Sequence, residues 1–136
     1  MKKIQLFSIS IVLLMSSFLC TAQTVKKETS TSTANQVEAY YFHNTSRCVT
    51  CKTVEAEAKA DLENLYGGQV TFKALNLEDD ATKPIAEKLQ VSGQTLLIVK
   101  GNQKINLTNE GFMYARTNPA KFKSIIKEKV DKLLEL

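Results

Sequence analysis

The sequence predicts an α/β protein with elements in the order β-α-β-α-β-β-α, in which helices cover both faces of a central mixed sheet. Three observations predict this class. Runs of β-branched and aromatic residues alternate with segments of helical spacing. A Gly-Gly pair and a Gly-Asn pair mark element boundaries. The 136 residues, of which 43% are hydrophobic and 24% charged, suit one globular domain.

The first two elements are a buried strand and an amphipathic helix. Residues 37–42 are rich in β-branched and aromatic side chains, which predicts the strand. Residues 48–66 have helical spacing, and the glycines at 67 and 68 end that helix. Its apolar face carries Cys51, Val54, Ala58, Leu62 and Leu65, and the opposite face carries Glu55, Lys59 and Glu63.

A strand, a short helix and a hairpin follow. Residues 70–77 alternate in character as a strand does, and residues 82–89 have the pattern of a short helix. Residues 95–100 form an apolar strand. The tight turn Gly101-Asn102 then leads into a hairpin partner at residues 104–107.

The last predicted element is a long amphipathic helix. Asn118 is the expected N-cap and Pro119 the first helical residue. One apolar stripe follows, formed by Phe122, Ile125, Ile126, Val130, Leu133 and Leu134. Ahead of the helix, Phe112, Met113 and Tyr114 are expected to pack into the core, and an apolar rim is the alternative.

The N-terminus has the pattern of a cleaved signal peptide. A basic start is followed by an apolar run at residues 4–19 and a small-x-small pattern that predicts cleavage between Ala22 and Gln23. Cleavage leaves 136 − 22 = 114 residues. The run is shorter than the roughly 20 residues that a membrane-spanning helix needs, which argues against an uncleaved anchor. A lipoprotein cut that acylates Cys20 is the minority alternative, because Leu19 is not the small residue that such a cut requires.

Residues 1–22 are therefore assigned to the signal, residues 23–36 to a flexible polar tether, and residues 37–136 to the folded domain. We expect an exported, periplasmic protein. The formal net charge of +4 falls to about +2 when Lys2 and Lys3 leave with the signal. No basic cluster is interleaved with aromatic residues, so a nucleic-acid partner is not expected. Membrane association is expected only if the chain is lipidated.

The two cysteines of the mature chain, Cys48 and Cys51, have C-x-x-C spacing at the start of the first predicted helix. A helix N-terminus stabilises an anion, so a cysteine there gains thiolate character, and the thiolate is the nucleophile. Arg47 and Lys52 flank the motif and act in the same direction. Cys48 is thus the expected attacking residue. Cys51, one turn further on and facing the core, is the expected resolving residue.

Two purely structural roles for the cysteine pair are alternatives to thiol-disulfide exchange. A disulfide that only clips the helix would close a very short loop and stabilise little. A structural zinc site needs four ligands, and the chain has a single histidine, His43. His43 could tune the pKa of Cys48 or simply close the strand at the surface. The aromatic run Tyr40-Tyr41-Phe42 is expected to be core packing.

The stretch YYFHNTSRCVTCKTVEAEA resembles the strand, active site and helix of thioredoxins, and VSGQTLLIVKGNQK resembles their later strand and hairpin. The resemblance covers about residues 37–136. It implies the thioredoxin-like fold and dithiol/disulfide exchange, with Cys48 nucleophilic and Cys51 resolving. More narrowly, SGQTLLIV with NEGFMYARTNP resembles small exported bacterial thioredoxin-like proteins, some labelled as a nitrophenyl-compound nitroreductase subunit. No flavin or nicotinamide motif is present, and no cofactor is expected.

Three positions depart from the thioredoxin pattern. Gln94, ahead of Thr95, stands where thioredoxins have a cis-proline. A cis bond before a residue other than proline costs about 2.5–4 kcal/mol, so Gln94 is expected to be trans and to alter the docking edge. Arg47 stands in place of the usual tryptophan, and Tyr41 or Phe42 falls where many thioredoxins have a buried acid.

The sequence therefore predicts an exported thiol-disulfide oxidoreductase or electron-relay protein that acts on the cysteines of a protein partner. Residues expected to tune the cysteines or to dock the partner are Arg47, Lys52, His43, Gln94 and Thr95. Two alternatives remain open. The paired thiolates could carry a soft metal or metalloid, or the fold could serve as a non-catalytic adaptor.

Overall fold

Four strands form one mixed sheet in the order β2-β1-β3-β4 in the computed structural model, which describes residues 36–135. The inner strand β1 (Val37–His43) runs parallel to β2 (Val70–Asn76) and antiparallel to β3 (Thr95–Lys100). A hairpin joins β3 to the antiparallel strand β4 (Gln103–Asn106). Strand β1 is therefore hydrogen-bonded to a neighbour on each side.

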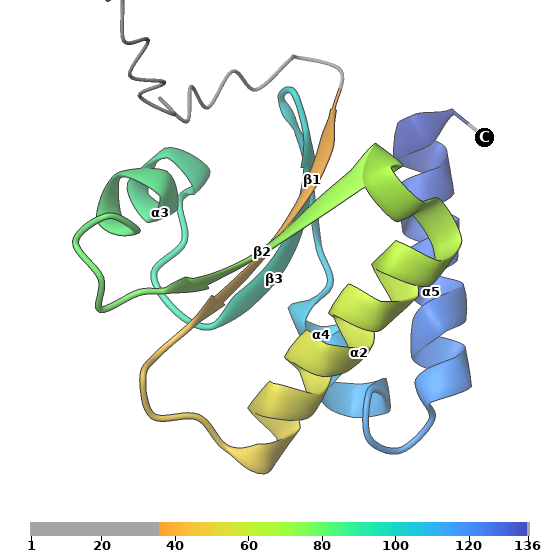
Figure 1. The fold of residues 1–136 in the computed structure, drawn as a ribbon, viewed down its shortest axis with the longest axis horizontal. Coiled ribbons are helices and arrows are strands. Elements are labelled where there is room, and N and C mark those ends of the chain that lie inside the picture. The colour runs from red at the N-terminus through yellow and green to blue at the C-terminus, as the bar shows by residue number, and fades with distance from the viewer. Residues whose placement is uncertain (1–35, 136) are drawn as a thin grey trace, which may run out of the picture. The chain divides into compact units, whose positions relative to one another are not determined.

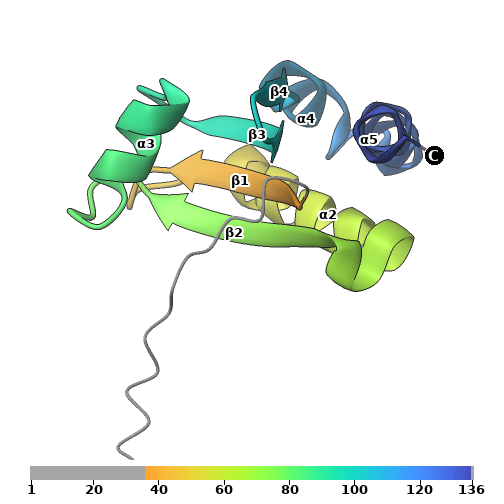
Figure 2. The same cartoon turned by 90° about the horizontal axis from the view of Figure 1, so that it is seen from above.

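Helices cover both faces of this sheet (Figures 1 and 2). One face carries α2 (Val49–Tyr66), α4 (Thr108–Tyr114) and α5 (Pro119–Leu134), and the other carries α3 (Lys83–Leu89). A single 3-10 turn, η1 (Gly67–Gln69), connects α2 to β2. This arrangement confirms the predicted α/β class, with its mixed sheet between two layers of helices.

The alternation of side chains along β1 creates two hydrophobic cores. Ala39 and Tyr41 face α2 and α5, whereas Tyr40 and Phe42 face α3. The larger core joins the sheet to three helices; its fully buried large side chains are Val37, Tyr41, Val54, Leu62, Leu96, Ile98, Leu107, Phe122, Ile126 and Val130. The smaller core lies beneath α3.

Most element boundaries follow from local chemistry that is visible in the sequence. Gly67 ends α2 with a φ of +52°, a left-handed conformation that glycine adopts without strain. The side chain of Asn118 accepts a hydrogen bond from the backbone N–H of Lys121, which confirms it as the N-cap of α5. Strand β4 ends one residue earlier than predicted because Leu107 is buried in the core ahead of α4.

Helix α4 is the element that the sequence-based order lacks. Asn106 supports its start by accepting hydrogen bonds from the backbone N–H (3.0 Å) and hydroxyl (2.6 Å) of Thr108. The helix has only seven residues, and its buried side is set by Gly111 and the following Ala115. The expectation that Phe112 and Met113 pack into the core is wrong: their exposed fractions are 37% and 55%, because they lie on the outer side of this short helix.

Within residues 36–135, no helix is long and apolar enough to cross a membrane. The predicted signal at residues 1–22 and nearly all of the predicted tether at residues 23–36 lie outside the described residues. Both assignments therefore stay predictions, as does acylation of Cys20.

Candidate redox site

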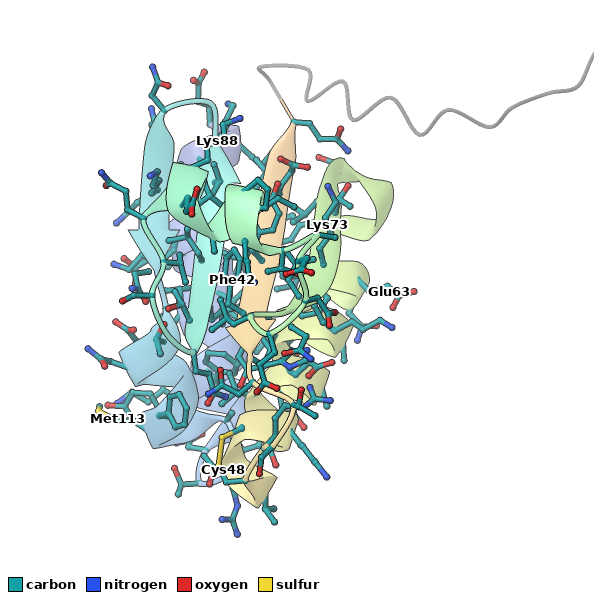
Figure 3. The ribbon with its side chains drawn as sticks, turned by 90° about the vertical axis from the view of Figure 1, so that its left-hand side faces the viewer. Phe42, Cys48, Glu63, Lys73, Lys88 and Met113 are labelled. Atoms are coloured by element: carbon teal, nitrogen blue, oxygen red, sulfur yellow. A yellow bond between two sulfur atoms is a disulfide. The ribbon has the colours of Figure 1, made fainter. Side chains whose placement is uncertain are left out.

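The N-terminus of α2 carries a disulfide between Cys48 and Cys51, whose Cα atoms are 5.2 Å apart (Figure 3). Cys48 is the N-cap of the helix and is exposed to solvent, whereas Cys51 lies in the first turn and is 6% exposed. The sulfur of Cys48 accepts a hydrogen bond from the backbone N–H of Cys51 at 3.2 Å. One residue of the pair is thus exposed to solvent and the other is sheltered.

The loop between β1 and α2 is fixed by polar contacts with the end of β2. Thr45 donates to the carboxylate of Glu78 from its backbone N–H (3.1 Å) and from its hydroxyl (2.8 Å). The side-chain amide of Asn76 donates to the Thr45 hydroxyl oxygen at 2.8 Å. The two hydrogen bonds from Thr45 lower the pKa of Glu78, which keeps this carboxylate ionised as an acceptor. The loop that delivers Cys48 is therefore anchored to the sheet.

Tyr41 connects the sheet to the buried cysteine. Its ring is fully buried, and its hydroxyl donates to the backbone carbonyl of Cys51 at 2.8 Å. The side-chain amide of Gln94 donates in turn to the Tyr41 oxygen. Burial raises the pKa of Tyr41, although the hydrogen bond from Gln94 acts in the opposite direction, so the hydroxyl remains protonated and can act as a donor.

An ion pair between Arg47 and Glu55 lies beside this cluster, and both side chains are only about a quarter exposed, at 25% and 26%. The charge of Arg47 is therefore not directed to Cys48 alone, because a carboxylate partly offsets it. Lys52 is exposed and makes no ion pair within the described part of the chain. The predicted effect of Arg47 and Lys52 on the cysteines stays a prediction.

The remaining predicted site residues lie close to the cluster. The ring centroid of His43 is 6.2 Å from that of Tyr41, and its Nδ1 lies 3.0 Å from the carbonyl oxygen of Asn44. Thr95 donates from its hydroxyl to the carbonyl of Gly93 at 2.9 Å, so it shapes the loop ahead of β3. All peptide bonds in the described region are trans, including those of Gln94.

Helix α4 lies beside the first turns of α2. A Cβ atom added to Gly111 would lie 2.8 Å from Val54 Cγ1, which shows how closely the two helices approach. Beyond α4, the guanidinium of Arg116 lies 3.4 Å from the hydroxyl of Thr50, inside the C-x-x-C segment. Among the described residues the large hydrophobic side chains with high exposure are three, here called the apolar rim: Val49, Phe112 and Met113.

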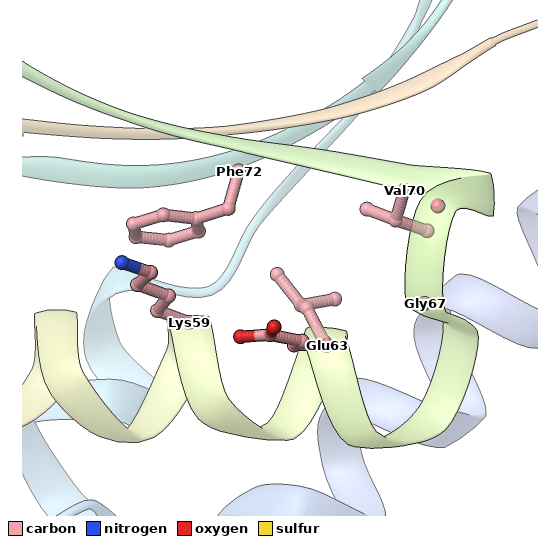
Figure 4. Close-up of a pocket in the computed structure, with 7 residues that line it drawn as sticks. Lys59, Glu63, Gly67, Val70 and Phe72 are labelled. Carbon is pink, nitrogen blue, oxygen red and sulfur yellow. The ribbon is translucent and has the colours of Figure 1, made fainter.

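Two other features of the surface do not belong to the disulfide. A groove near the C-terminal end of α2 is lined by Lys59, Leu62, Glu63, Gly67, Gly68, Val70 and Phe72, and it contains neither cysteine (Figure 4). Within residues 36–135, no group of three or more His, Cys, Asp or Glu side chains is arranged to hold a metal ion.

Sequence reasoning assigned the cysteine pair, their order of exposure and Gln94 to one region. It expected Tyr41 to pack in the core, and noted only that Tyr41 or Phe42 stands where many thioredoxins have a buried acid. The contribution of the Tyr41 hydroxyl was missed, and so was the pairing of Glu55 with Arg47. A signal for Tyr41 does exist. In a strand with period-two alternation it shares a face with Ala39, and that face is the one covered by the helix that carries Cys51.

No protein-family model matches the chain, and no curated protein matches its sequence. Solved structures with a similar fold include thioredoxin O2 from Arabidopsis thaliana in its oxidised state, at 20% identity over 69% of this chain and 75% of that one, with a TM-score of 0.47. A malarial protein is similar at 18% identity over 70% of this chain and 97% of that one, with the same TM-score of 0.47. The narrower resemblance to nitroreductase-labelled proteins gains no support from these matches.

Proposed function

We propose that this chain is a thiol-disulfide oxidoreductase that exchanges the Cys48–Cys51 disulfide with cysteines of a partner protein. One observation carries the proposal: the pair lies at a helix N-terminus, where Cys48 is exposed and Cys51 is buried. A disulfide that only stabilises the start of the helix does not require this difference in exposure between its two cysteines, whereas stepwise thiol-disulfide exchange does. Cys48 must be accessible to the partner's disulfide, and Cys51 must react only after the mixed disulfide with Cys48 has formed.

In the reducing direction the exchange has two steps. The Cys48 thiolate attacks a partner disulfide, so that a bond from Cys48 to one partner sulfur forms while the partner's S–S bond breaks and its other sulfur leaves as a thiolate. The Cys51 thiolate then attacks the Cys48 sulfur, which re-forms the internal disulfide and expels the second partner thiolate. The partner gains two electrons and the chain becomes oxidised. The reverse sequence oxidises a partner dithiol.

The surroundings of Cys48 favour a protein as the partner. Val49, the residue after Cys48, is 68% exposed, and Met113, which lies at the same end of the molecule as Cys48 (Figure 3), is 55% exposed. A protein partner would bury such apolar side chains, whereas a small thiol would not. The amide groups at the start of α2 and the positive end of its dipole stabilise a thiolate at Cys48. As part of the proposal, the exchange takes place outside the cytoplasm, where the N-terminal signal pattern would deliver the chain and where disulfides persist.

Trapping of mixed disulfides tests the proposal. We expect Cys51→Ser to accumulate covalent adducts with partner proteins, which are released by reductant, because the resolving thiol is missing. Cys48→Ser, the matched control, is expected to trap little, since its remaining thiol is buried. The double variant, Cys48→Ser with Cys51→Ser, controls for adducts that do not depend on thiols.

Equal trapping by the two single variants, or none by either, would contradict the proposal. Tight binding of Cu(I), Zn(II) or As(III) that depends on the cysteines, without any disulfide exchange, would instead support a soft-metal carrier. Full biological activity of the double variant would support an adaptor. Both results would overturn the proposed function.

A further inference from the structure

The hydroxyl of Tyr41 is held in a fixed place by the most constrained strand of the sheet. Strand β1 pairs with β2 and β3, in registers that include Tyr41 with Ala74 and with Leu96. The Tyr41 side chain has no exposed surface. Its donation to the Cys51 carbonyl at 2.8 Å therefore ties the first turn of α2 to a rigid point. Helix ends otherwise fray readily, since their terminal groups lack intrahelical partners.

Gln94 determines the direction in which the Tyr41 hydroxyl donates. The Gln94 amide N–H donates a hydrogen bond to the Tyr41 oxygen, so the hydroxyl's own hydrogen points at the Cys51 carbonyl. Gln94 is itself only partly exposed, in the loop ahead of β3. These contacts form one chain of hydrogen bonds from that loop to the peptide of the sheltered cysteine.

We propose that Tyr41, oriented by Gln94, is a positioning residue for the resolving step, in which Cys51 attacks the mixed disulfide on Cys48. The inference rests on the proposed function. Once Cys48 is bonded to a partner, the internal disulfide no longer holds the two cysteines together. The Tyr41 hydrogen bond then keeps the Cys51 peptide in register with Cys48, so the attacking sulfur stays in near-attack geometry. The first step uses only the exposed Cys48 and does not need this bond.

The aromatic disulfide DTNB separates the two steps with one reagent. Cys48 of the reduced protein attacks DTNB and releases one coloured thionitrobenzoate, and Cys51 then releases a second one from the adduct. Stopped-flow absorbance at equal concentrations of protein and DTNB gives a rate for each release. Cys51→Ser is expected to give the first release alone, which assigns the two phases.

We expect Tyr41→Phe to slow the second release about tenfold, the effect of losing roughly one hydrogen bond in the transition state. The first release should stay within about twofold of the wild-type rate, a barrier change well under that of one hydrogen bond. Gln94→Leu should slow the second release in the same sense. The combined variant should be no slower than Tyr41→Phe, because Gln94 acts through the Tyr41 hydroxyl.

Tyr40→Phe is the matched control, since it removes a hydroxyl from the next residue of the same strand. Tyr40 faces the other core and donates to Glu38 at 2.7 Å, away from the cysteines. Its two release rates should match those of the wild type. Urea unfolding of each variant separates loss of positioning from loss of the fold. If Tyr41→Phe does not fold, the Gln94→Leu rates decide the question.

An unchanged second release in Tyr41→Phe, or equal slowing of both releases, would overturn the positioning role and leave the proposed function intact. Slowing in Tyr40→Phe as large as in Tyr41→Phe would also overturn it. A wild-type protein that releases no second thionitrobenzoate would overturn the proposed function itself, together with the inference that rests on it.

Discussion

The sulfur of Cys48 accepts a hydrogen bond from the backbone N–H of Cys51 at 3.2 Å, so the redox pair also provides the N-cap of α2. The exposed sulfur satisfies one of the N–H groups that lack a partner at the start of a helix. The proposed thiol exchange and the stability of the helix start therefore depend on the same sulfur atom, and a variant of Cys48 changes both.

We expect Cys48→Ser to be more stable than Cys48→Ala by about 1 kcal/mol under reducing conditions, because serine can cap the helix and alanine cannot. Urea unfolding with excess reductant measures the difference. Asn118, the N-cap of α5, gives the matched comparison, since it accepts from Lys121 at 3.1 Å. Asn118→Ser and Asn118→Ala should differ in the same sense. Equal stability of the two Cys48 variants would show that the sulfur does not act as a cap.

A second prediction concerns Asp61, which is buried between α2 and α5 with Lys123 Nζ 3.5 Å from its Oδ1. Its other oxygen has no hydrogen-bond partner among the described residues. Burial raises the pKa of Asp61 above its usual 3.8, although Lys123 lowers it. The folded state therefore holds this proton more tightly than the unfolded chain. The resulting stability is present at low pH and is lost as pH rises through the folded pKa.

The free energy of unfolding of the wild type, measured relative to Asp61→Asn, should therefore fall as pH is raised from about 3 to 7. Asp131 gives a control of opposite sign, because hydrogen bonds from Lys127 and Tyr66 lower its pKa. Relative to Asp131→Asn, the wild type should gain stability over the same range. Parallel pH profiles for the two comparisons would contradict the assignment of Asp61.

A third prediction tests the close approach of α4 to α2. In Gly111→Ala the new Cβ would lie 2.8 Å from Cγ1 of Val54, a fully buried and stiff side chain, and 3.5 Å from the ring of Phe122. We expect a loss of about 1–2 kcal/mol, since overpacking costs about 1–3 kcal/mol and alanine recovers up to about 1 kcal/mol of helix propensity.

Chemical unfolding measures this loss, and two companion variants check its cause. Gly68→Ala should change stability by less than about 0.5 kcal/mol, because nothing lies within 4 Å of its added Cβ. Adding Val54→Ala to Gly111→Ala should restore part of what the clash removed, so the two changes should be clearly non-additive. Additive losses would mean that the helices do not touch at this point.

A fourth prediction concerns the apolar rim and depends on the proposed function. Met113→Glu should leave the free energy of unfolding within about 0.5 kcal/mol of its starting value, since this side chain is 55% exposed. Combined with Cys51→Ser, it should reduce the yield of trapped partner proteins several-fold while the reaction with DTNB stays unchanged. Gln103→Glu is the matched control, because the β3–β4 hairpin lies at the opposite end of the sheet from the start of α2 (Figure 1). Undiminished trapping by Met113→Glu would exclude the rim as a docking surface.

The fold could be predicted from the sequence because its signals are local. The alternation in β1, the apolar stripe of α5 and the glycine at the end of α2 each depend on a few neighbouring residues. Helix α4 was missed for a related reason. Of its seven residues only Gly111 is buried, and the buried Ala115 follows the helix, so no apolar stripe marks it.

The polar part of the site could be predicted only in part, because its contacts join residues far apart in the chain. Cys48 and Cys51 could be predicted as site residues from their C-x-x-C spacing and from the helix that follows. The hydrogen bond from Tyr41 to the Cys51 carbonyl depends instead on how far α2 is shifted along β1, and that shift is set by packing across the core. The donation from Gln94 depends further on the path of a loop 53 residues away from Tyr41.

The inner position of β1 has a consequence for the dynamics of the redox site. A strand that is paired on both sides and buried against two cores exchanges its amide hydrogens only when much of the domain opens. The first turn of α2 opens more readily than that, since it is a helix end held by the disulfide and by the hydrogen bond from Tyr41. Reduction of the disulfide should therefore speed deuterium uptake near Cys51 and leave β1 as slow as before. Under the proposed function, each change of oxidation state would then loosen one helix end while the slowest-exchanging segment of the fold stays closed.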